Sequence, residues 1–117
     1  MRSGLLASLI AISITGCSAA NAAQFDAEND IHCAALSVAW RIASVQQGAP
    51  ADQQKAIAFV EDWYGRKVRE LALSRGEEKV LAEANSIAKV VEKDLLSLKR
   101  ETLACTDRAI KDAGLGS

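Results

Sequence analysis

Three cysteines carry the most informative chemistry in this sequence, because a thiol can form a disulfide, ligate a metal or carry a lipid. Cys17 lies in an apolar N-terminal stretch, whereas Cys33 and Cys105 lie in the more polar remainder of the chain. Two cysteines in a small exported domain usually pair. A disulfide that closes a loop of this length stabilises a fold by about 4 kcal/mol when it restricts the unfolded chain. We therefore predict a structural disulfide between Cys33 and Cys105.

The alternative interpretation of Cys33 and Cys105 is a redox-active or metal-binding thiol pair. The chain has no C-x-x-C motif, and its single histidine, His32, cannot complete a metal site with them. A Cys–His dyad is not expected either, because adjacent side chains on a helix point about 100° apart. We expect no metal or other cofactor, and we interpret His32 as a capping or surface residue that can titrate with periplasmic pH.

Carboxylates and aromatic side chains are the remaining candidates for a site. The carboxylates lie among lysines and arginines, as solvated helix faces do, whereas a catalytic pair must converge in a cleft. The sequence has no serine nucleophile elbow, phosphate-binding glycine loop or zinc motif, so we predict that the protein is not an enzyme. Aromatic residues at helical spacing are usually core residues, but four of them could line a small apolar pocket: Trp40, Phe59, Trp63 and Tyr64.

Residues 1–22 have the pattern of an export signal. Arg2 supplies the positive start, and the apolar run LLASLIAISI follows shortly after it. About ten apolar residues are too few to cross a bilayer, which requires about twenty. We therefore expect the mature protein to be exported from the cytoplasm.

Two cleavage sites compete within this signal. Residues 14–17 (ITGC) resemble the bacterial lipoprotein signal, which implies removal of residues 1–16 and a lipid on Cys17. Residues 20–22 (ANA) form an A-x-A site, and cleavage there would remove residues 1–22 and release a soluble periplasmic protein. We favour the lipoprotein signal, and both products keep the two later cysteines.

The stretch from Asn29 to Gln47 has the clearest helical pattern of the chain. Its apolar residues recur at steps of three and four, which places them on two adjacent stripes of one helix. Only a narrow third strip is polar, so we expect other helices to wrap this one. The first stripe holds Ile31, Ala35, Val38, Ile42 and Val45, the second holds Cys33, Leu36, Trp40 and Ala43, and the polar strip holds Ser37, Arg41 and Ser44.

Two further helical stretches follow. The first extends from about Pro50 to Ser74, and Gly65 in its middle predicts a close approach to the preceding helix or a kink. From Glu77 to Asp112 no glycine or proline interrupts the apolar spacing, which by itself predicts one long helix.

The predicted disulfide argues against that long helix. In an up-down-up arrangement of three helices, Cys33 and Cys105 would lie tens of Å apart, whereas a disulfide needs Cα atoms within about 7 Å. We therefore predict an all-α fold, a small up-down bundle of four helices with one disulfide, and a break between Val91 and Asp94. Three helices with one long C-terminal helix is the alternative. The expected divisions of the chain are a flexible lead-in at residues 23–28, a helical domain at 29–113 and a tail at 114–117.

The charge pattern excludes one class of partner. The 117 residues carry a formal net charge of −1, and the basic residues alternate with acidic ones instead of forming a stripe. Nucleic-acid binding requires such a basic surface, so we expect no nucleic-acid partner.

The leader is followed by Cys-Ala-Ala at residues 33–35, an aromatic-Gly-Arg step at residues 63–66 and a single late cysteine at 105. Together these features resemble a group of small exported two-cysteine helical proteins of alphaproteobacteria. The resemblance implies a helical exported protein and brings no established activity. The layout is also similar to that of the periplasmic acid-stress chaperones, small helical proteins with one disulfide, whose pattern near the second cysteine is echoed by residues 104–107 (ACTD).

These observations lead to one expected function and two alternatives. We expect an exported protein of a Gram-negative bacterium, periplasmic or anchored to a membrane through a lipid on Cys17. Its expected role is a non-enzymatic binding or structural module of the cell envelope with another envelope protein as its partner. A periplasmic chaperone-like stress protein is the alternative, and an enzyme is a remote one. The sequence predicts neither the identity of the partner nor the oligomeric state.

Overall fold

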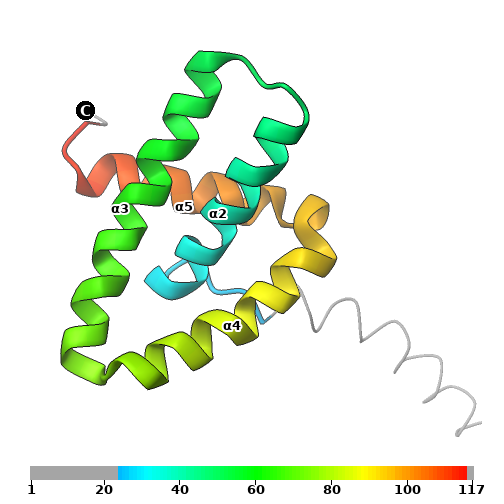
Figure 1. Cartoon of the computed structure of the whole chain (residues 1–117). Coiled ribbons are helices and arrows are strands. Elements are labelled where there is room, and N and C mark those ends of the chain that lie inside the picture. Colours follow the sequence, from blue (N-terminus) through cyan, green and yellow to red (C-terminus); the bar gives the residue numbers. More distant parts are fainter. Residues whose placement is uncertain (1–23, 116–117) are drawn as a thin grey trace, which may run out of the picture.

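A computed structural model describes residues 24–115 of the chain, and every regular element in that range is a helix (Figure 1). The all-α class and the disulfide predicted from the sequence are therefore confirmed. The predicted signal peptide, Cys17 and the last two residues lie outside the described range. The elements are α2 (Asp30–Gln46), α3 (Ala51–Arg75), α4 (Glu77–Asp94), the 3-10 helix η1 (Leu95–Leu98) and α5 (Lys99–Asp112).

The ends of α2 lie where the sequence provides caps. The side-chain oxygen of Asn29 accepts the backbone N–H groups of Ile31 (2.8 Å) and His32 (3.3 Å), which the first helical turn leaves without partners. At the other end Gly48 has a φ of 69° and donates its N–H to the carbonyl of Val45. This Schellman-type end requires a left-handed residue, which favours glycine. The predicted bounds of this helix are therefore confirmed closely.

A single glycine joins α3 to α4. Gly76 has a φ of 100°, and the chain turns sharply at this point (Figure 1). Gly65, in the middle of α3, does not mark the close helix approach that the sequence suggests. A Cβ atom at this position would meet only Arg69 Nη1, at 3.7 Å, and no atom of another helix. α3 continues through Gly65 as one helix, and nothing in the structure explains why this residue is glycine.

The turn η1 redirects the chain between α4 and α5. Side chains at positions i and i+3 of a 3-10 helix eclipse one another, so Leu95 and Leu98 both pack on the core while Leu96 is exposed. The break predicted at residues 91–94 therefore lies a few residues later. Asp94 immediately precedes the turn, but its side chain makes no capping hydrogen bond. Because α4, η1 and α5 follow one another without a non-helical residue, they can also be counted as one bent helix, which is the predicted three-helix alternative.

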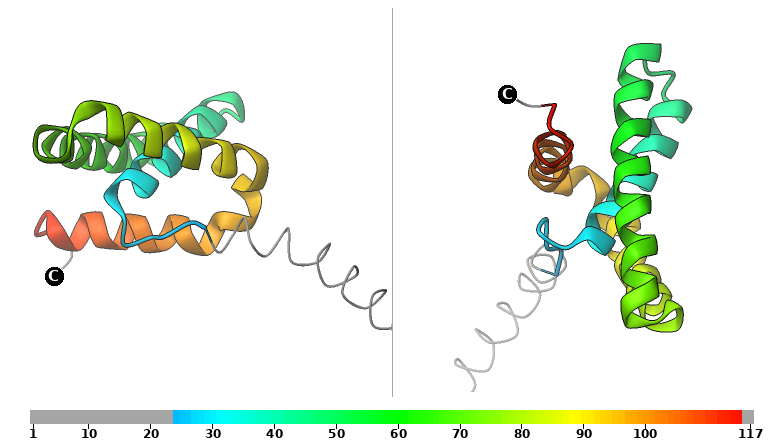
Figure 2. Two further views of the ribbon diagram at one scale, coloured as in Figure 1. Left: turned by 90° about the horizontal axis from the view of Figure 1, so that it is seen from below. Right: turned by 90° about the vertical axis from the view of Figure 1, so that its left-hand side faces the viewer.

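The helices form two layers around α2. Figure 2 shows α3 and α4 in one layer and α5 in the other, with the segment that precedes α2 running alongside α5. α2 contacts α3, α4 and α5. The buried core between these elements consists of Phe25, Cys33, Leu36, Val60, Tyr64, Ile87, Val91, Leu98, Cys105 and Ala109.

The exposure of α2 differs from the prediction on two of its faces. Ser37 and Ser44, expected on a polar strip, are only 6% and 4% exposed, and each hydroxyl donates to a carbonyl of the preceding turn. Such a local bond lets serine be buried without a partner from another helix. Val38, Ile42 and Val45, expected in an apolar interface, are 38%, 46% and 55% exposed. Other helices therefore cover the first turns of α2, whereas its last turns leave one apolar face uncovered.

The segment of residues 24–29, here called the N-terminal arm, packs against the start of α2. Phe25 is buried in the core, and the centroid of its ring lies 5.5 Å from that of His32. The Asp26 carboxylate accepts the backbone N–H of Glu28 at 2.9 Å, which shapes the arm into a turn. Phe25 and Ala27, which belong to the predicted lead-in, therefore pack against the helical domain.

Candidate functional site

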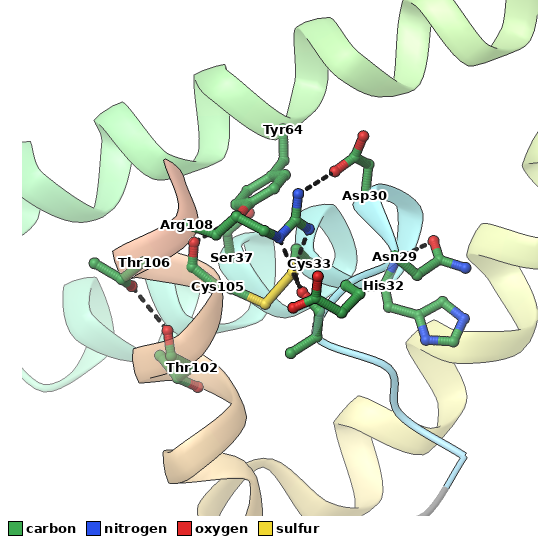
Figure 3. Close-up of a disulfide and its surroundings, with 12 residues drawn as sticks. Asn29, Asp30, His32, Cys33, Ser37, Tyr64, Thr102, Cys105, Thr106 and Arg108 are labelled. Atoms are coloured by element: carbon green, nitrogen blue, oxygen red, sulfur yellow. Dashed lines mark hydrogen bonds and ion pairs between the residues drawn. A yellow bond between two sulfur atoms is a disulfide. The ribbon is translucent and has the colours of Figure 1, made fainter. Parts of the chain in front are cut away.

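The Cys33–Cys105 disulfide joins the start of α2 to the middle of α5 (Figure 3). The two Cα atoms lie 5.7 Å apart, within the range that a disulfide requires. Both side chains are buried. The pair predicted from the sequence therefore forms, and it lies at the junction of the two layers.

Two polar groups contact the Cys33 sulfur of this disulfide, the carbonyl oxygen of Ala27 at 3.2 Å and the Arg108 guanidinium. Arg108 lies on α5 one turn after Cys105, and its Nη2 is 3.4 Å from the Cys33 sulfur (Figure 3). Its Nη1 donates to Asp30 Oδ1 at 2.8 Å, and its Nε donates to the backbone carbonyl of Ala27 at 3.2 Å. One guanidinium group thus connects α5, the start of α2 and the N-terminal arm.

Tyr64 brings α3 to the same place. Its side chain is fully buried, and its hydroxyl donates to the Cys105 carbonyl at 2.5 Å. The guanidinium of Arg108 lies 5.1 Å from the centre of its ring, a cation–π distance. Burial raises the pKa of Tyr64 to about 12, against an opposing effect of Arg108, so the phenol remains a neutral donor at physiological pH. The polar groups around the disulfide therefore satisfy one another.

A second polar cluster holds the N-terminal arm at the other side of α2. His32 Nδ1 accepts the backbone N–H of Asp26 at 2.9 Å, and its Nε2 lies 3.5 Å from Glu83 Oε2 on α4. Glu83 also accepts hydrogen bonds from the Asn29 amide at 2.9 Å and from Arg75 at 3.2 Å. His32 is thus an acceptor at Nδ1, a role that requires this nitrogen to be unprotonated.

The ionisation of this cluster follows from its contacts. Burial lowers the pKa of His32, and the negative charges of Glu83 and Asp26 oppose this shift without reversing it. The hydrogen bond from Asn29 is the largest cause of the lowered pKa of Glu83, and Arg75 adds to it. At neutral pH the cluster therefore pairs a neutral imidazole with a carboxylate.

A small apolar pocket, here called the disulfide pocket, lies between α2, α3 and α5. Its volume is about 80 Å³, and both cysteines form part of its wall. Leu36 and Ile57 contribute aliphatic walls, and Trp40 contributes an aromatic one. The Trp40 indole N–H donates to the hydroxyl of Thr102, which also lines the pocket. The pocket therefore has apolar walls and reaches the buried disulfide.

Trp40 is the one member of the predicted aromatic pocket that lines this space. Phe59 and Trp63 stack on each other along α3, with ring centroids 6.4 Å apart, and the cations of Arg66 and Lys67 both lie 5.2 Å from the Trp63 ring. Tyr64 follows Trp63 directly and points instead to the disulfide. The four aromatic residues therefore do not line one common pocket: Trp40 lies at the disulfide pocket, Phe59 and Trp63 stack along α3, and Tyr64 lies beside the disulfide.

A shallow groove, here called the α2–α4 groove, lies on the opposite side of α2 from the disulfide pocket. Its volume is about 360 Å³. The exposed side chains of Val38 and Ile42 line it from α2, and Glu92 is the one charged residue among its lining. Its remaining walls are Ala35, Ala39, Ala43 and Gln46 from α2, and Ala88, Val91 and Leu95 from α4 and η1.

The acidic residues of the described chain do not form a metal site. No group of three or more histidine, cysteine, aspartate or glutamate side chains within residues 24–115 could hold an ion. Two of the carboxylates considered above are paired instead: Glu61 accepts from Arg41 at 2.8 Å, and Asp62 lies 3.3 Å from Arg66. Within the same range no helix is both long enough and apolar enough to span a bilayer.

Arg108 and Glu83 were not predicted from the sequence as site residues. The only available signal for Arg108 is its position three residues after Cys105, which puts both on one face of a helix. Its partner Asp30 lies 78 residues away, so local spacing cannot indicate the pair. Comparison with known proteins found no matching family model, no matching curated protein and no matching solved structure.

Proposed function

We propose that this chain is a non-enzymatic binding module of the cell envelope that holds a helix of another protein in its α2–α4 groove. The exposed aliphatic side chains of Val38 and Ile42, which line this groove, carry the proposal. Uncovered apolar side chains that line a groove are typical of protein-binding surfaces. By contrast, the polar groups around the disulfide and His32 are engaged in holding the fold together.

The shape and charge of the groove favour an amphipathic helix as its occupant. The lining of α2 extends from Ala35 to Gln46, which is about 16 Å at the helical rise and matches three turns of a docked helix. Its alanines permit close approach of a second backbone, and Val38 and Ile42 provide apolar contacts. Glu92 at the groove favours a lysine or arginine at the edge of the apolar face of that helix.

Photo-crosslinking in cells tests this proposal. A benzoylphenylalanine placed at position 42 should form adducts with a partner, whereas the same group at the exposed position 100 on α5 should not. The adduct should map to an amphipathic helix of the partner. A synthetic peptide of that helix should bind the purified protein, and Ile42→Asp should weaken its binding at least tenfold.

A matched control tests whether an aspartate weakens peptide binding only when it lies in the groove. Leu103 is exposed on α5 outside the groove, so Leu103→Asp makes the same chemical change elsewhere and should leave peptide binding unchanged. Equal adducts at positions 42 and 100, or equal weakening by the two aspartate variants, would contradict a groove-specific function.

The anchored form of the proposal concerns Cys17. With a lipid on this residue, a linker of residues 18–23 would connect the membrane to the N-terminal arm. The intact mass of the native protein tests this point in membrane and soluble fractions. A lipid-sized increase on a chain that starts at Cys17 supports anchoring, whereas a soluble chain that starts near Ala23 supports release into the periplasm.

A second candidate function is a chaperone that opens in acid, and one observation favours it. His32 Nδ1 can hold the backbone N–H of Asp26 only while it is unprotonated, so acid weakens the attachment of the N-terminal arm, which buries Phe25. Suppression of the aggregation of a test protein at roughly pH 2 to 3, absent at neutral pH, would support this function. Equal aggregation with and without the protein at both pH values would remove it.

A further inference from the structure

The two sulfurs of the disulfide have different surroundings. Arg108 Nη2 lies 3.4 Å from the Cys33 sulfur, so a positive charge and an N–H donor are directed at that atom, and the carbonyl oxygen of Ala27 also lies 3.2 Å from it. No equivalent cation contacts the Cys105 sulfur in the described structure, where the hydrogen bond from Tyr64 is made to the backbone carbonyl of Cys105. The bond is therefore electrostatically asymmetric.

The disulfide pocket gives a route to this bond. Cys33 and Cys105 both line it, and the walls beside Cys105 come from Thr102 and Thr106 on the same helix. Ala56, at the rim on α3, is exposed, so the pocket opens to solvent near this residue. A small neutral molecule can therefore approach sulfurs that a protein-sized thiol cannot reach.

We propose that Cys33–Cys105 is a thiol–disulfide exchange site for small neutral thiols, which attack Cys105 from the disulfide pocket and release Cys33 as the thiolate. This activity goes beyond the proposed binding function and does not depend on it. Arg108 determines which sulfur is attacked and which one leaves, because the sulfur that is better stabilised as a thiolate is the better leaving group.

The exchange balances without another reagent. The thiolate of the incoming molecule donates an electron pair to the Cys105 sulfur, a new S–S bond forms there, and the Cys33–Cys105 bond breaks. The electron pair of the broken bond remains on the Cys33 sulfur, next to the Arg108 guanidinium. A second molecule of the same thiol then attacks the mixed disulfide, which frees Cys105 and leaves the two small molecules joined as a disulfide.

The pocket also sets the class of thiol. A volume of about 80 Å³ with apolar walls accommodates a compact uncharged thiol, such as β-mercaptoethanol. Glutathione is larger and carries several charges, and no charged side chain lines the pocket to pair with them. The expected preference is therefore at least tenfold in rate for β-mercaptoethanol over glutathione at equal thiolate concentration.

Peptide mapping of a trapped intermediate tests which of the two cysteines the small thiol attacks. Free thiols of the folded, oxidised protein are first alkylated, and β-mercaptoethanol is then added briefly before excess N-ethylmaleimide stops the reaction. The expected product carries mercaptoethanol on Cys105 and N-ethylmaleimide on Cys33. The reverse distribution, equal amounts of both, or cleavage no faster than global unfolding measured by hydrogen exchange would each overturn the proposal.

Arg108→Gln distinguishes stabilisation of the leaving thiolate from a structural role. Loss of the charge should slow cleavage by β-mercaptoethanol about tenfold. If Arg108 only held the fold together, the same variant would loosen the domain and speed cleavage. An unchanged or higher rate in Arg108→Gln therefore overturns the proposal.

Two further variants serve as controls. Tyr64→Phe removes a hydrogen bond at Cys105 but keeps the charge of Arg108, so its cleavage should be as fast as in the parent protein or faster. A slowing equal to that of Arg108→Gln would show that charge is not the cause. Ala56→Leu narrows the opening of the pocket and should slow cleavage of the disulfide by β-mercaptoethanol severalfold. An unchanged cleavage rate would overturn the proposed route.

Discussion

The two halves of α2 lie in opposite environments although their residues alternate in a similar pattern. The first half, around Cys33 and Leu36, is enclosed by α3, α5 and the N-terminal arm, and is tied down by the disulfide. The second half, around Ile42, packs its serine-bearing strip inward and leaves its branched aliphatic side chains exposed. One helix thus combines a half that the disulfide ties to α5 with a half that leaves an apolar face uncovered, and perturbations of the two halves should have different consequences.

Removal of the disulfide should have the largest effect, because it releases the enclosed half. Cys33 and Cys105 are separated by 72 positions, and the loss of a crosslink over such a loop should lower the free energy of unfolding by about 4 kcal/mol. Urea denaturation of Cys33→Ala/Cys105→Ala checks this value, with the reduced parent protein as a control. A loss below about 1 kcal/mol would show that the packing around Leu36 is sufficient by itself.

Truncation of one aliphatic residue in each half should show the contrast directly. Leu36 is 1% exposed, so Leu36→Ala should lower the free energy of unfolding by about 2–5 kcal/mol. Ile42 is nearly half exposed, and Ile42→Ala should cost less than about 1 kcal/mol while weakening binding at the groove. Equal losses in chemical denaturation would mean that the groove face is covered in solution, and a concentration-dependent midpoint would assign that cover to a second copy.

The buried hydrogen bond of Tyr64 should have a smaller effect. Tyr64→Phe removes the donor to the Cys105 carbonyl, at an expected cost of about 1 kcal/mol. Ser37→Ala is the matched control, because the Ser37 hydroxyl donates only to its own helix and should change stability by less than about 0.5 kcal/mol. Thermal unfolding of the two variants side by side separates a bond between layers from a bond within one helix.

Acid should weaken the enclosed half through His32. The pKa of His32 is lowered from 6.5 by burial, so the unfolded chain binds a proton more readily than the folded one. The contribution of His32 to the free energy of unfolding is therefore fully present above pH 6.5. It declines as the pH falls below 6.5 toward the lower pKa of the folded state. Urea midpoints measured at about pH 7.5 and 5.5 should differ in the parent protein and converge in His32→Gln. An equal pH dependence in both proteins would exclude His32 as its cause.

The contribution of Glu83 to stability can be measured separately at a lower pH than that of His32. Its pKa lies below the usual 4.5, so its contribution is complete above pH 4.5 and is lost as the pH falls further. Glu83→Gln should flatten the stability profile only in this lower range. The two variants together show which charge holds the N-terminal arm.

Local pattern was sufficient to predict much of this fold. The apolar spacing from Asn29 to Gln47 closely predicted the extent of α2, and the requirement that Cys33 meet Cys105 predicted a break in the last helical stretch a few residues before its observed place. The break itself has no glycine or proline to mark it, because a 3-10 turn that buries Leu98 needs neither.

The surroundings of the disulfide could not be predicted in the same way. A stripe pattern identifies the helical faces but not the helix that covers each one, and a serine bonded to its own backbone can be buried as readily as alanine. This is why Ser37 and Ser44 were expected outside and Val38 inside. The contact of Arg108 with Asp30 depends on how the two layers meet, and no periodicity within one helix contains that information.

The position of the disulfide also determines what proteolysis can separate. Because Cys33 and Cys105 lie close to the two ends of the helical domain, the covalent bond closes most of α2, all of α3 and α4, and half of α5 into a ring. A protease that cuts once inside this ring, for instance at the turn around Gly76, leaves a single covalently connected molecule with its core contacts in register. Such a protein falls into separate pieces only when a cut and a reduction coincide, which couples its turnover to the redox state of its surroundings.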